Sequence, residues 1–177
     1  MMKKQTWFHL GGRRVALGAA GLMALLAAPP AEAAAPAAAP AQKAADNVEK
    51  TLWMTDFKAA QALAAKEKKP LLVSFSGSDW CGWCIKLDKE VFHQPEFAKW
   101  AAEHFVMFQA DFPRRAPQSR ELKMQNAALA EQFRVEGFPT VVLLRPDGRA
   151  FATTGYRPGG AKAYIAHLQE LLKNAGL

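Results

Sequence analysis

Residues 71–84 read LLVSFSGSDWCGWC. The first five, Leu71 to Phe75, are almost all apolar and predict a strand that is buried on both faces, as in a parallel sheet. Residues 76–79 have the composition of a turn, and a helix is predicted to begin near Cys81. The two cysteines of the chain, Cys81 and Cys84, therefore lie where a strand gives way to a helix.

The spacing of these cysteines suits a reactive dithiol. Residues three apart on a helix lie on neighbouring faces, within the Cα separation of about 4.4 to 6.8 Å that a disulfide needs. The helix N-terminus places N–H groups and partial positive charge near Cys81, which favours its thiolate. Cys84 lies one turn deeper and is expected to be shielded. We therefore assign Cys81 as the attacking nucleophile and Cys84 as the resolving thiol.

Two other roles for the pair carry less weight. A bond between Cys81 and Cys84 closes too short a loop to stabilise the fold much. Structural zinc takes four protein ligands, the chain has two cysteines, and no two of His93, His104 and His167 show paired ligand spacing. We predict no metal site, with zinc or copper as the minor alternative.

Asp79, two residues before Cys81, has two candidate roles. It is either a proton-transfer group beside the sulfurs or a cap at the start of the helix. The cap is the simpler role.

The rest of the chain alternates helices and strands. Helices are predicted from the cap Asp56 to Lys68 and over residues 95–104, 126–134 and 161–174, strands over residues 105–110, 140–144 and 149–154, a loop over residues 111–118 and a hairpin turn over residues 146–148. Two parallel βα units followed by a hairpin and a covering helix make an α/β fold. Its predicted architecture is a central mixed β-sheet with helices on both faces.

Two motifs together resemble the thioredoxin superfamily. They are Trp80-Cys81-Gly82-Trp83-Cys84 and Val135-Glu136-Gly137-Phe138-Pro139-Thr140, and the resemblance covers about Leu52 to Leu177. The run from Gly77 to Phe92 is most similar to exported thioredoxin-like proteins related to the C-terminal domain of the envelope thiol-disulfide interchange reductase.

The resemblance implies a thioredoxin fold and thiol-disulfide exchange through a mixed disulfide on Cys81, with no cofactor. It also implies that the Phe138–Pro139 peptide bond is cis and faces the dithiol, and that the backbone beside it pairs with an extended substrate segment. Trp83 has little room to bury itself and is a candidate contact for a partner protein. The candidate substrate-binding residues are Trp80, Gly82, Trp83, Phe138 and Pro139.

Two positions depart from the family pattern. Thioredoxins carry a buried acid on the strand before the dithiol, and Ser74 occupies that position here. Gly82 and Trp83 replace the proline- or histidine-containing pairs of better-known members. They supply no charge to stabilise the thiolate, so we expect a less oxidising couple than one with histidine there.

The N-terminal region has the pattern of an export signal. Basic residues precede an apolar run from Val15 to Ala28, which is shorter than the roughly 20 residues of a spanning helix, and Ala31-Glu32-Ala33 follows. We predict a signal peptide over residues 1–33, with an uncleaved membrane anchor as the alternative. Residues 34–50 form an Ala/Pro-rich linker, and residues 51–177 form the thioredoxin-like domain. The expected location is the bacterial periplasm.

The charge of the chain argues against a nucleic-acid partner. Removing residues 1–33 takes away four basic residues and Glu32, which lowers the formal charge from +7 to +4. The remaining basic clusters, such as Arg114-Arg115, are short and interrupted.

The sequence thus predicts an exported thiol-disulfide oxidoreductase, with reduction of protein disulfides favoured over oxidation or isomerisation. Its expected partners are disulfide-containing proteins and a membrane protein that supplies electrons. The alternative is a binding module that holds a protein client or a copper ion on the same fold.

Overall fold

The structure is a computed structural model, and it describes residues 52–177. The predicted signal peptide (1–33) and linker (34–50) lie outside the described residues. Within the described part of the chain, no helix combines the length and the hydropathy that crossing a membrane requires.

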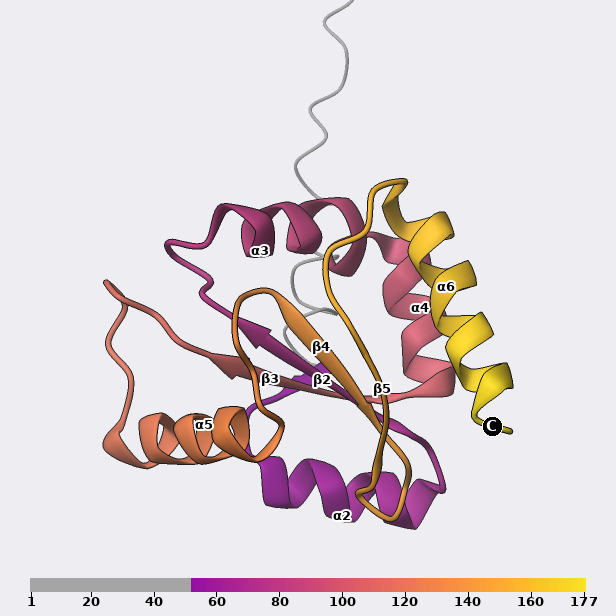
Figure 1. Ribbon diagram of the computed structural model, residues 1–177, viewed down its shortest axis with the longest axis horizontal. Coiled ribbons are helices and arrows are strands. Elements are labelled where there is room, and N and C mark those ends of the chain that lie inside the picture. The colour runs from indigo at the N-terminus through magenta and orange to yellow at the C-terminus, as the bar shows by residue number, and fades with distance from the viewer. Residues whose placement is uncertain (1–51) are drawn as a thin grey trace, which may run out of the picture. The chain divides into compact units, whose positions relative to one another are not determined.

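Helices and strands alternate along the described chain (Figure 1). In order they are β1 (Trp53–Met54), α2 (Phe57–Glu67), β2 (Leu71–Ser76), α3 (Gly82–Leu87), the π-helix η1 (Asp88–Phe92), α4 (Pro95–His104), β3 (Val106–Asp111), α5 (Arg120–Gln132), β4 (Thr140–Leu144), β5 (Ala150–Thr154) and α6 (Gly160–Asn174).

The strands form one mixed sheet in the order β1-β3-β2-β4-β5. β1 and β2 run parallel to β3, whereas β4 runs antiparallel to both β2 and β5. Val73, in the middle of β2, lies opposite Phe108 of β3 and Val142 of β4. β2 is therefore the central strand, and every one of its residues is buried.

Side chains of β2 alternate between two hydrophobic cores. Leu72 points into one core, with residues of η1, α4 and α6 such as Phe92, Phe97 and Tyr164. Val73 and Phe75 point into the other core, which α2 and α5 cover. Figure 1 shows α2 and α5 on one side of the sheet and α4 and α6 on the other. This confirms the predicted mixed sheet with helices on both faces.

Three connecting segments meet at the end of the sheet where β2 and β3 finish. β2 and β3 end together, because Ser76 is the register partner of Asp111. β4 begins at the same edge, since Thr140 lies opposite Phe75. The segments 77–81, 112–119 and 137–139 are therefore neighbours, although they are far apart in the sequence.

Two helical segments differ from the sequence prediction. α5 begins at Arg120, six residues before the predicted start, because the Ser119 hydroxyl accepts a hydrogen bond from the N–H of Leu122 (3.2 Å). The first turns of α5 are mostly polar, so hydrophobic periodicity did not reveal them. The helix that follows the dithiol continues from α3 into the π-helical turn η1, which no residue pattern had indicated.

Candidate functional site

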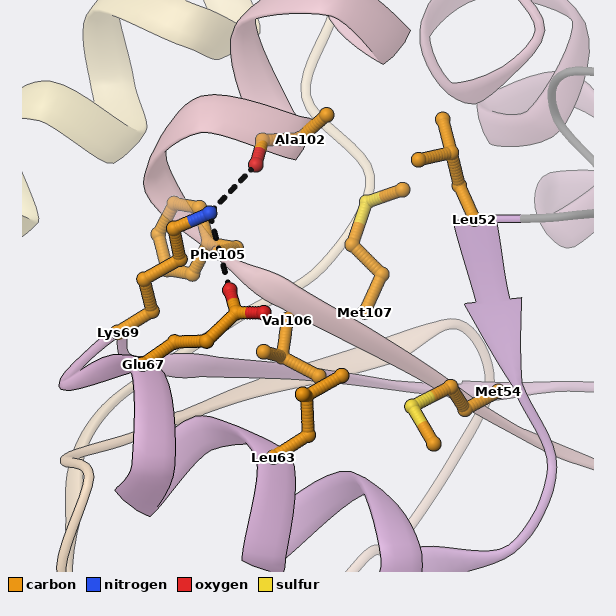
Figure 2. A pocket seen from close by; sticks show the side chains of 9 residues that line it. All are labelled: Leu52, Met54, Leu63, Glu67, Lys69, Ala102, Phe105, Val106 and Met107. Carbon is orange, nitrogen blue, oxygen red and sulfur yellow. Dashed lines mark hydrogen bonds and ion pairs between the residues drawn. The ribbon is translucent and has the colours of Figure 1, made fainter.

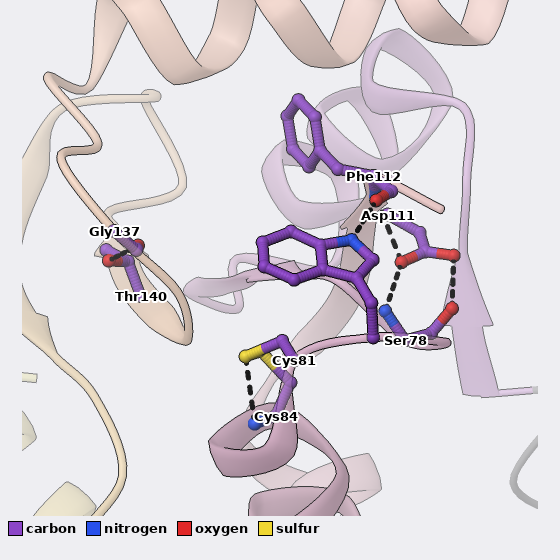
Figure 3. The surroundings of a disulfide bond; sticks show 8 residues. Ser78, Cys81, Cys84, Asp111, Phe112, Gly137 and Thr140 are labelled. Atoms are coloured by element: carbon purple, nitrogen blue, oxygen red, sulfur yellow. Dashed lines mark hydrogen bonds between the residues drawn. A yellow bond between two sulfur atoms is a disulfide. The ribbon is translucent and has the colours of Figure 1, made fainter. Parts of the chain in front are cut away.

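Cys81 and Cys84 form a disulfide at the start of α3 (Figure 3). Their Cα atoms are 5.2 Å apart. Cys81 is itself the N-cap of α3, because its Sγ accepts a hydrogen bond from the N–H of Cys84 (3.2 Å). The turn before it is closed by the N–H of Cys81, which donates to the carbonyl of Gly77 (2.8 Å). The dithiol is thus held by backbone hydrogen bonds on both sides.

The two sulfur-bearing residues differ in access. Cys81 is 7% exposed and Cys84 is 1% exposed. The N–H of Cys84 points at Sγ of Cys81 and is placed to stabilise negative charge there when the disulfide is reduced. The arrangement favours Cys81 as the attacking thiolate and Cys84 as the shielded thiol.

The segment before β4 contacts the turn that precedes the dithiol. The Phe138–Pro139 peptide bond is cis. The ring of Phe138 meets the indole of Trp80 edge to face, with centroids 5.9 Å apart. Thr140 fixes the turn, because its hydroxyl donates to the carbonyl of Gly137 (2.7 Å), as Figure 3 shows.

Trp80 is locked in place from several sides. Its Nε1–H donates to the carbonyl of Phe112 (2.8 Å), and the guanidinium of Arg114 lies 3.7 Å from its ring centroid. A Cβ atom built on Gly77 would lie 2.5 Å from the indole ring, so only glycine allows this close approach. The indole is thus part of the wall between the dithiol turn and the segment after β3.

Trp83 forms an exposed aromatic patch next to the dithiol. It is 58% exposed, and its ring centroid lies 5.1 Å from that of Tyr156, which follows β5. The ammonium of Lys86 lies within cation–π range of both rings, at 5.3 and 5.1 Å. The hydroxyl of Tyr156 donates to Glu90 (2.8 Å), which fixes the tyrosine ring against the helix.

Gly82 leaves the space between the cysteines open. It is exposed, and a Cβ atom built on it meets no atom within 4 Å. A partner backbone can therefore approach the dithiol closely from this side. Of the predicted substrate-binding residues, Gly82 and Trp83 lie between the two cysteines and Trp80 precedes Cys81. Phe138, the residue before Pro139, packs against Trp80.

Comparison with known proteins agrees with this geometry. A family model described as a thioredoxin-like domain matches residues 57–171. The chain belongs to the thioredoxin-like family. It is 37% identical over 116 residues to the disulfide bond reductase DsbH of Chlamydia pneumoniae. The aligned region covers 64% of this chain and 70% of that protein.

Two further relatives support the same family. A solved structure of a DsbH oxidoreductase is 35% identical and matches with a TM-score of 0.65, over 68% of this chain and 83% of that one. The thiol:disulfide interchange protein DsbD of Vibrio vulnificus is 31% identical over 113 residues, which are 62% of this chain but 17% of that protein. This thioredoxin-like chain is a thiol-disulfide oxidoreductase.

Asp79 does not have the capping role that the sequence favoured. The cap of α3 is Cys81, and the carboxylate of Asp79 instead accepts hydrogen bonds from three consecutive N–H groups, those of Arg114 (2.9 Å), Arg115 (2.6 Å) and Ala116 (3.0 Å). The backbone hydrogen bonds hold the pKa of Asp79 below its ordinary value, so it stays ionised. In this thioredoxin-like protein Asp79 anchors a loop, and only the tertiary structure reveals it.

Asp88 is the titratable group that the sequence reasoning missed. Burial raises its pKa to about 6, with a smaller opposing effect of His93 and a reinforcing one of Asp111. Ser74, at the position of the usual thioredoxin acid, is buried and carries no charge. The signal that identifies Asp88 is its place four residues after Cys84, one helical turn along. It puts a partly buried carboxyl group with a raised pKa on the helix that carries the dithiol.

The described residues offer no candidate metal site beside the dithiol. No group of three His, Cys, Asp or Glu side chains within residues 52–177 is placed to hold a metal ion. A small groove lies beside β1 and the start of β3, lined by residues such as Met54 and Met107 (Figure 2). Lys69 borders it, pairing with Glu67 (3.1 Å) and donating to the carbonyl of Ala102 (3.0 Å). The groove is at the opposite end of β3 from the dithiol.

Proposed function

We propose that this thioredoxin-like protein is an exported reductase of protein disulfides, with Cys81 as nucleophile and Cys84 as resolving thiol. The observation that carries the proposal is the unequal access of the two cysteines, 7% against 1%, with the N–H of Cys84 directed at Sγ of Cys81. The name of the relative DsbH, a disulfide bond reductase, supports reduction as the direction.

The reaction proceeds in two exchanges. The Cys81 thiolate attacks one sulfur of a substrate disulfide, the substrate S–S bond breaks, and the departing thiolate takes a proton. The Cys84 thiolate then attacks Sγ of Cys81 in the mixed disulfide and expels the second substrate thiolate. Two electrons pass to the substrate, and the Cys81–Cys84 disulfide seen in the structure remains.

In this proposal, the substrate segment lies across Gly82 and beside Pro139. Gly82 is open, and Trp83 is the most exposed aromatic side chain next to the dithiol. Pro139 has no N–H, so the proposed pairing with an extended chain uses backbone groups of the residues next to it. Trp80 and Phe138 form the wall behind the sulfurs.

The oxidised protein needs a source of electrons. We propose a membrane redox protein as this source and the periplasm as the location, with residues 1–33 as signal peptide, 34–50 as linker and 51–177 as the exchange domain. The relationship to DsbD, a thiol:disulfide interchange protein that is much longer than the matched region, supports such a partner.

Trapping tests the order of the two thiols. Cys84→Ser is expected to accumulate mixed disulfides between Cys81 and envelope proteins, visible as adducts that a reductant dissolves. Cys81→Ser is the matched control and is expected to give none. Equal adducts from both variants, or none from either, contradict the assignment.

The reduction potential tests the direction. A Cys81/Cys84 couple near the value of about −270 mV found for thioredoxin makes the protein a reductant. A value higher by about 100 mV or more makes it an oxidant or isomerase and overturns the proposed direction.

A further inference from the structure

The segment between β3 and α5 is tied to the dithiol turn. The carboxylate of Asp79 accepts hydrogen bonds from the N–H groups of Arg114, Arg115 and Ala116, at 2.9, 2.6 and 3.0 Å. Because Asp79 lies two residues before Cys81, these bonds fix residues 114–116 relative to the reactive sulfur.

Further contacts join the end of β3 and the segment after it to both sides of the site. Ser78 donates from its N–H (2.9 Å) and its hydroxyl (2.6 Å) to the carboxylate of Asp111, as Figure 3 shows. The ring of Phe112 lies 5.0 Å from that of Phe138, the residue before Pro139. The segment therefore forms a fixed rim beside the dithiol.

On this rim, the guanidinium of Arg114 lies over the face of the Trp80 ring. Its guanidinium carbon lies 3.7 Å from the centroid of the Trp80 ring, and Trp80 is the residue before Cys81. A guanidinium held against a ring keeps the N–H groups of its edge free to bind an anion. Arg114 and Arg115 are both exposed, and neither side chain has an acidic partner within ion-pair distance among residues 52–177.

The other charged side chains around the site are a lysine in an ion pair and two acids. Lys86, beside Trp83, is paired with Glu90 at 3.8 Å. Asp79 is satisfied by its three N–H donors. Glu136, two residues before Phe138, is an exposed acid on the opposite segment. The charge of Arg115 also acts on Asp79 and helps to lower the pKa of that carboxyl. Arg114, held on Trp80, is thus the cation beside Cys81 that forms no ion pair among the described residues.

We propose that Arg114, held on Trp80 and assisted by Arg115, selects protein partners that carry an Asp or Glu side chain next to the exchanged cysteine. This inference rests on the proposed exchange at Cys81 and names the class of substrate. The guanidinium edge binds such a carboxylate through two parallel hydrogen bonds. Trp80 orders the arginine in advance, which lowers the entropic cost of that contact.

The test compares three synthetic peptides, each with one intramolecular disulfide and with Glu, Gln or Lys flanking the first cysteine. The full chain, reduced, is mixed with each peptide, and the rate constant of exchange is followed by tryptophan fluorescence. The wild-type protein is expected to react about tenfold faster with the Glu peptide than with the Lys peptide, with Gln between them, and about 0.5 M salt is expected to compress this range.

Two substitutions of Arg114 and one control test the role of the Arg114 guanidinium. Arg114→Gln is expected to reduce the Glu-to-Lys ratio to about twofold, and Arg114→Lys to keep an intermediate ratio because it retains charge without the planar fork. Both retain the backbone N–H that binds Asp79, so the loop stays anchored. Arg149→Gln is the matched control, because it removes the same charge from the turn between β4 and β5, at the far end of β4.

The uncharged 2-hydroxyethyl disulfide separates the two proposals. The rate at which each of the four proteins reduces it measures any general effect of a substitution on the dithiol, and each peptide rate constant is divided by that rate. No reaction by the wild-type protein would defeat the proposed exchange itself. Normal reaction with this probe, together with a wild-type ratio near one or an unchanged ratio in Arg114→Gln, would overturn the role of Arg114 alone.

Discussion

The backbone N–H of Cys84 donates a hydrogen bond to Sγ of Cys81, 3.2 Å away. The same peptide unit that places the resolving cysteine one turn into the helix therefore supplies a donor to the attacking one. Because Cys81 is also the more exposed residue, position and access act in the same direction.

In the reduced protein, iodoacetamide is expected to modify Cys81 at least tenfold faster than Cys84. The reason is the greater access and thiolate stabilisation of Cys81. Mass spectrometry of peptides after short labelling measures the ratio, and labelling in denaturant, where the two should react alike, is the control. Faster labelling of Cys84 in the folded protein would reverse the assigned order of attack.

Asp88→Asn is expected to stabilise the oxidised protein above pH 6. The folded state binds the Asp88 proton more tightly than the unfolded chain, because burial raises its pKa from 3.8 to about 6. The contribution of Asp88 to stability therefore falls as pH rises from about 4 to 6 and stays low above that. Removing the charge should recover up to about 3 kcal/mol at pH 8 and little at pH 4.

Urea unfolding at a series of pH values measures this difference between wild type and Asp88→Asn. Glu103→Gln, an exposed change on α4, is the control and should leave the pH dependence as it is. A gap between wild type and Asp88→Asn that does not change with pH would show that burial does not perturb Asp88.

Gly77→Ala is expected to destabilise the protein by about 1 to 3 kcal/mol. The added Cβ would lie 2.5 Å from the Trp80 indole, so the ring must move and lose its hydrogen bond to Phe112. Gly82→Ala is the matched control, because a Cβ there meets nothing within 4 Å and alanine is the better helix former. Thermal unfolding of both variants measures the difference in stability. Equal melting temperatures would mean that the Trp80 indole can move away from the added Cβ at no cost.

Trp83→Ala is expected to slow exchange with a protein disulfide several-fold while leaving the folded state nearly as stable. The side chain is 58% exposed, so little buried surface is lost. Kinetics with a protein substrate and with 2-hydroxyethyl disulfide separate docking from chemistry. An equal loss with both substrates would place Trp83 in the chemistry of the sulfurs rather than in partner binding.

Tyr156→Phe complements this variant. It removes the hydroxyl that donates to Glu90 but keeps the ring beside Trp83. If the aromatic surface is what a partner contacts, Tyr156→Phe should retain most of the rate that Trp83→Ala loses. A loss as large as that of Trp83→Ala would instead assign the effect to the hydroxyl.

Local patterns in the sequence predicted most of the elements that build the site. The apolar run that forms β2, the cysteine pair at a helix start and the segment from Pro95 to His104 each follow from residues close together in the chain. Short elements were missed where the local signal is weak. β1 has two residues and is defined only by its pairing with β3, and η1 differs from an α-helix by its hydrogen bonds alone.

By itself, the sequence determined the fold class and the dithiol, because hydrophobic periodicity, turn residues and cysteine spacing are all local. Only the tertiary structure decided the surroundings of the sulfurs. Asp79 meets Arg114 across 35 positions, and Tyr156 meets Glu90 across 66. The burial that raises the pKa of Asp88 is likewise a property of the packed helix. Such contacts depend on which strands lie side by side, so no local pattern encodes them.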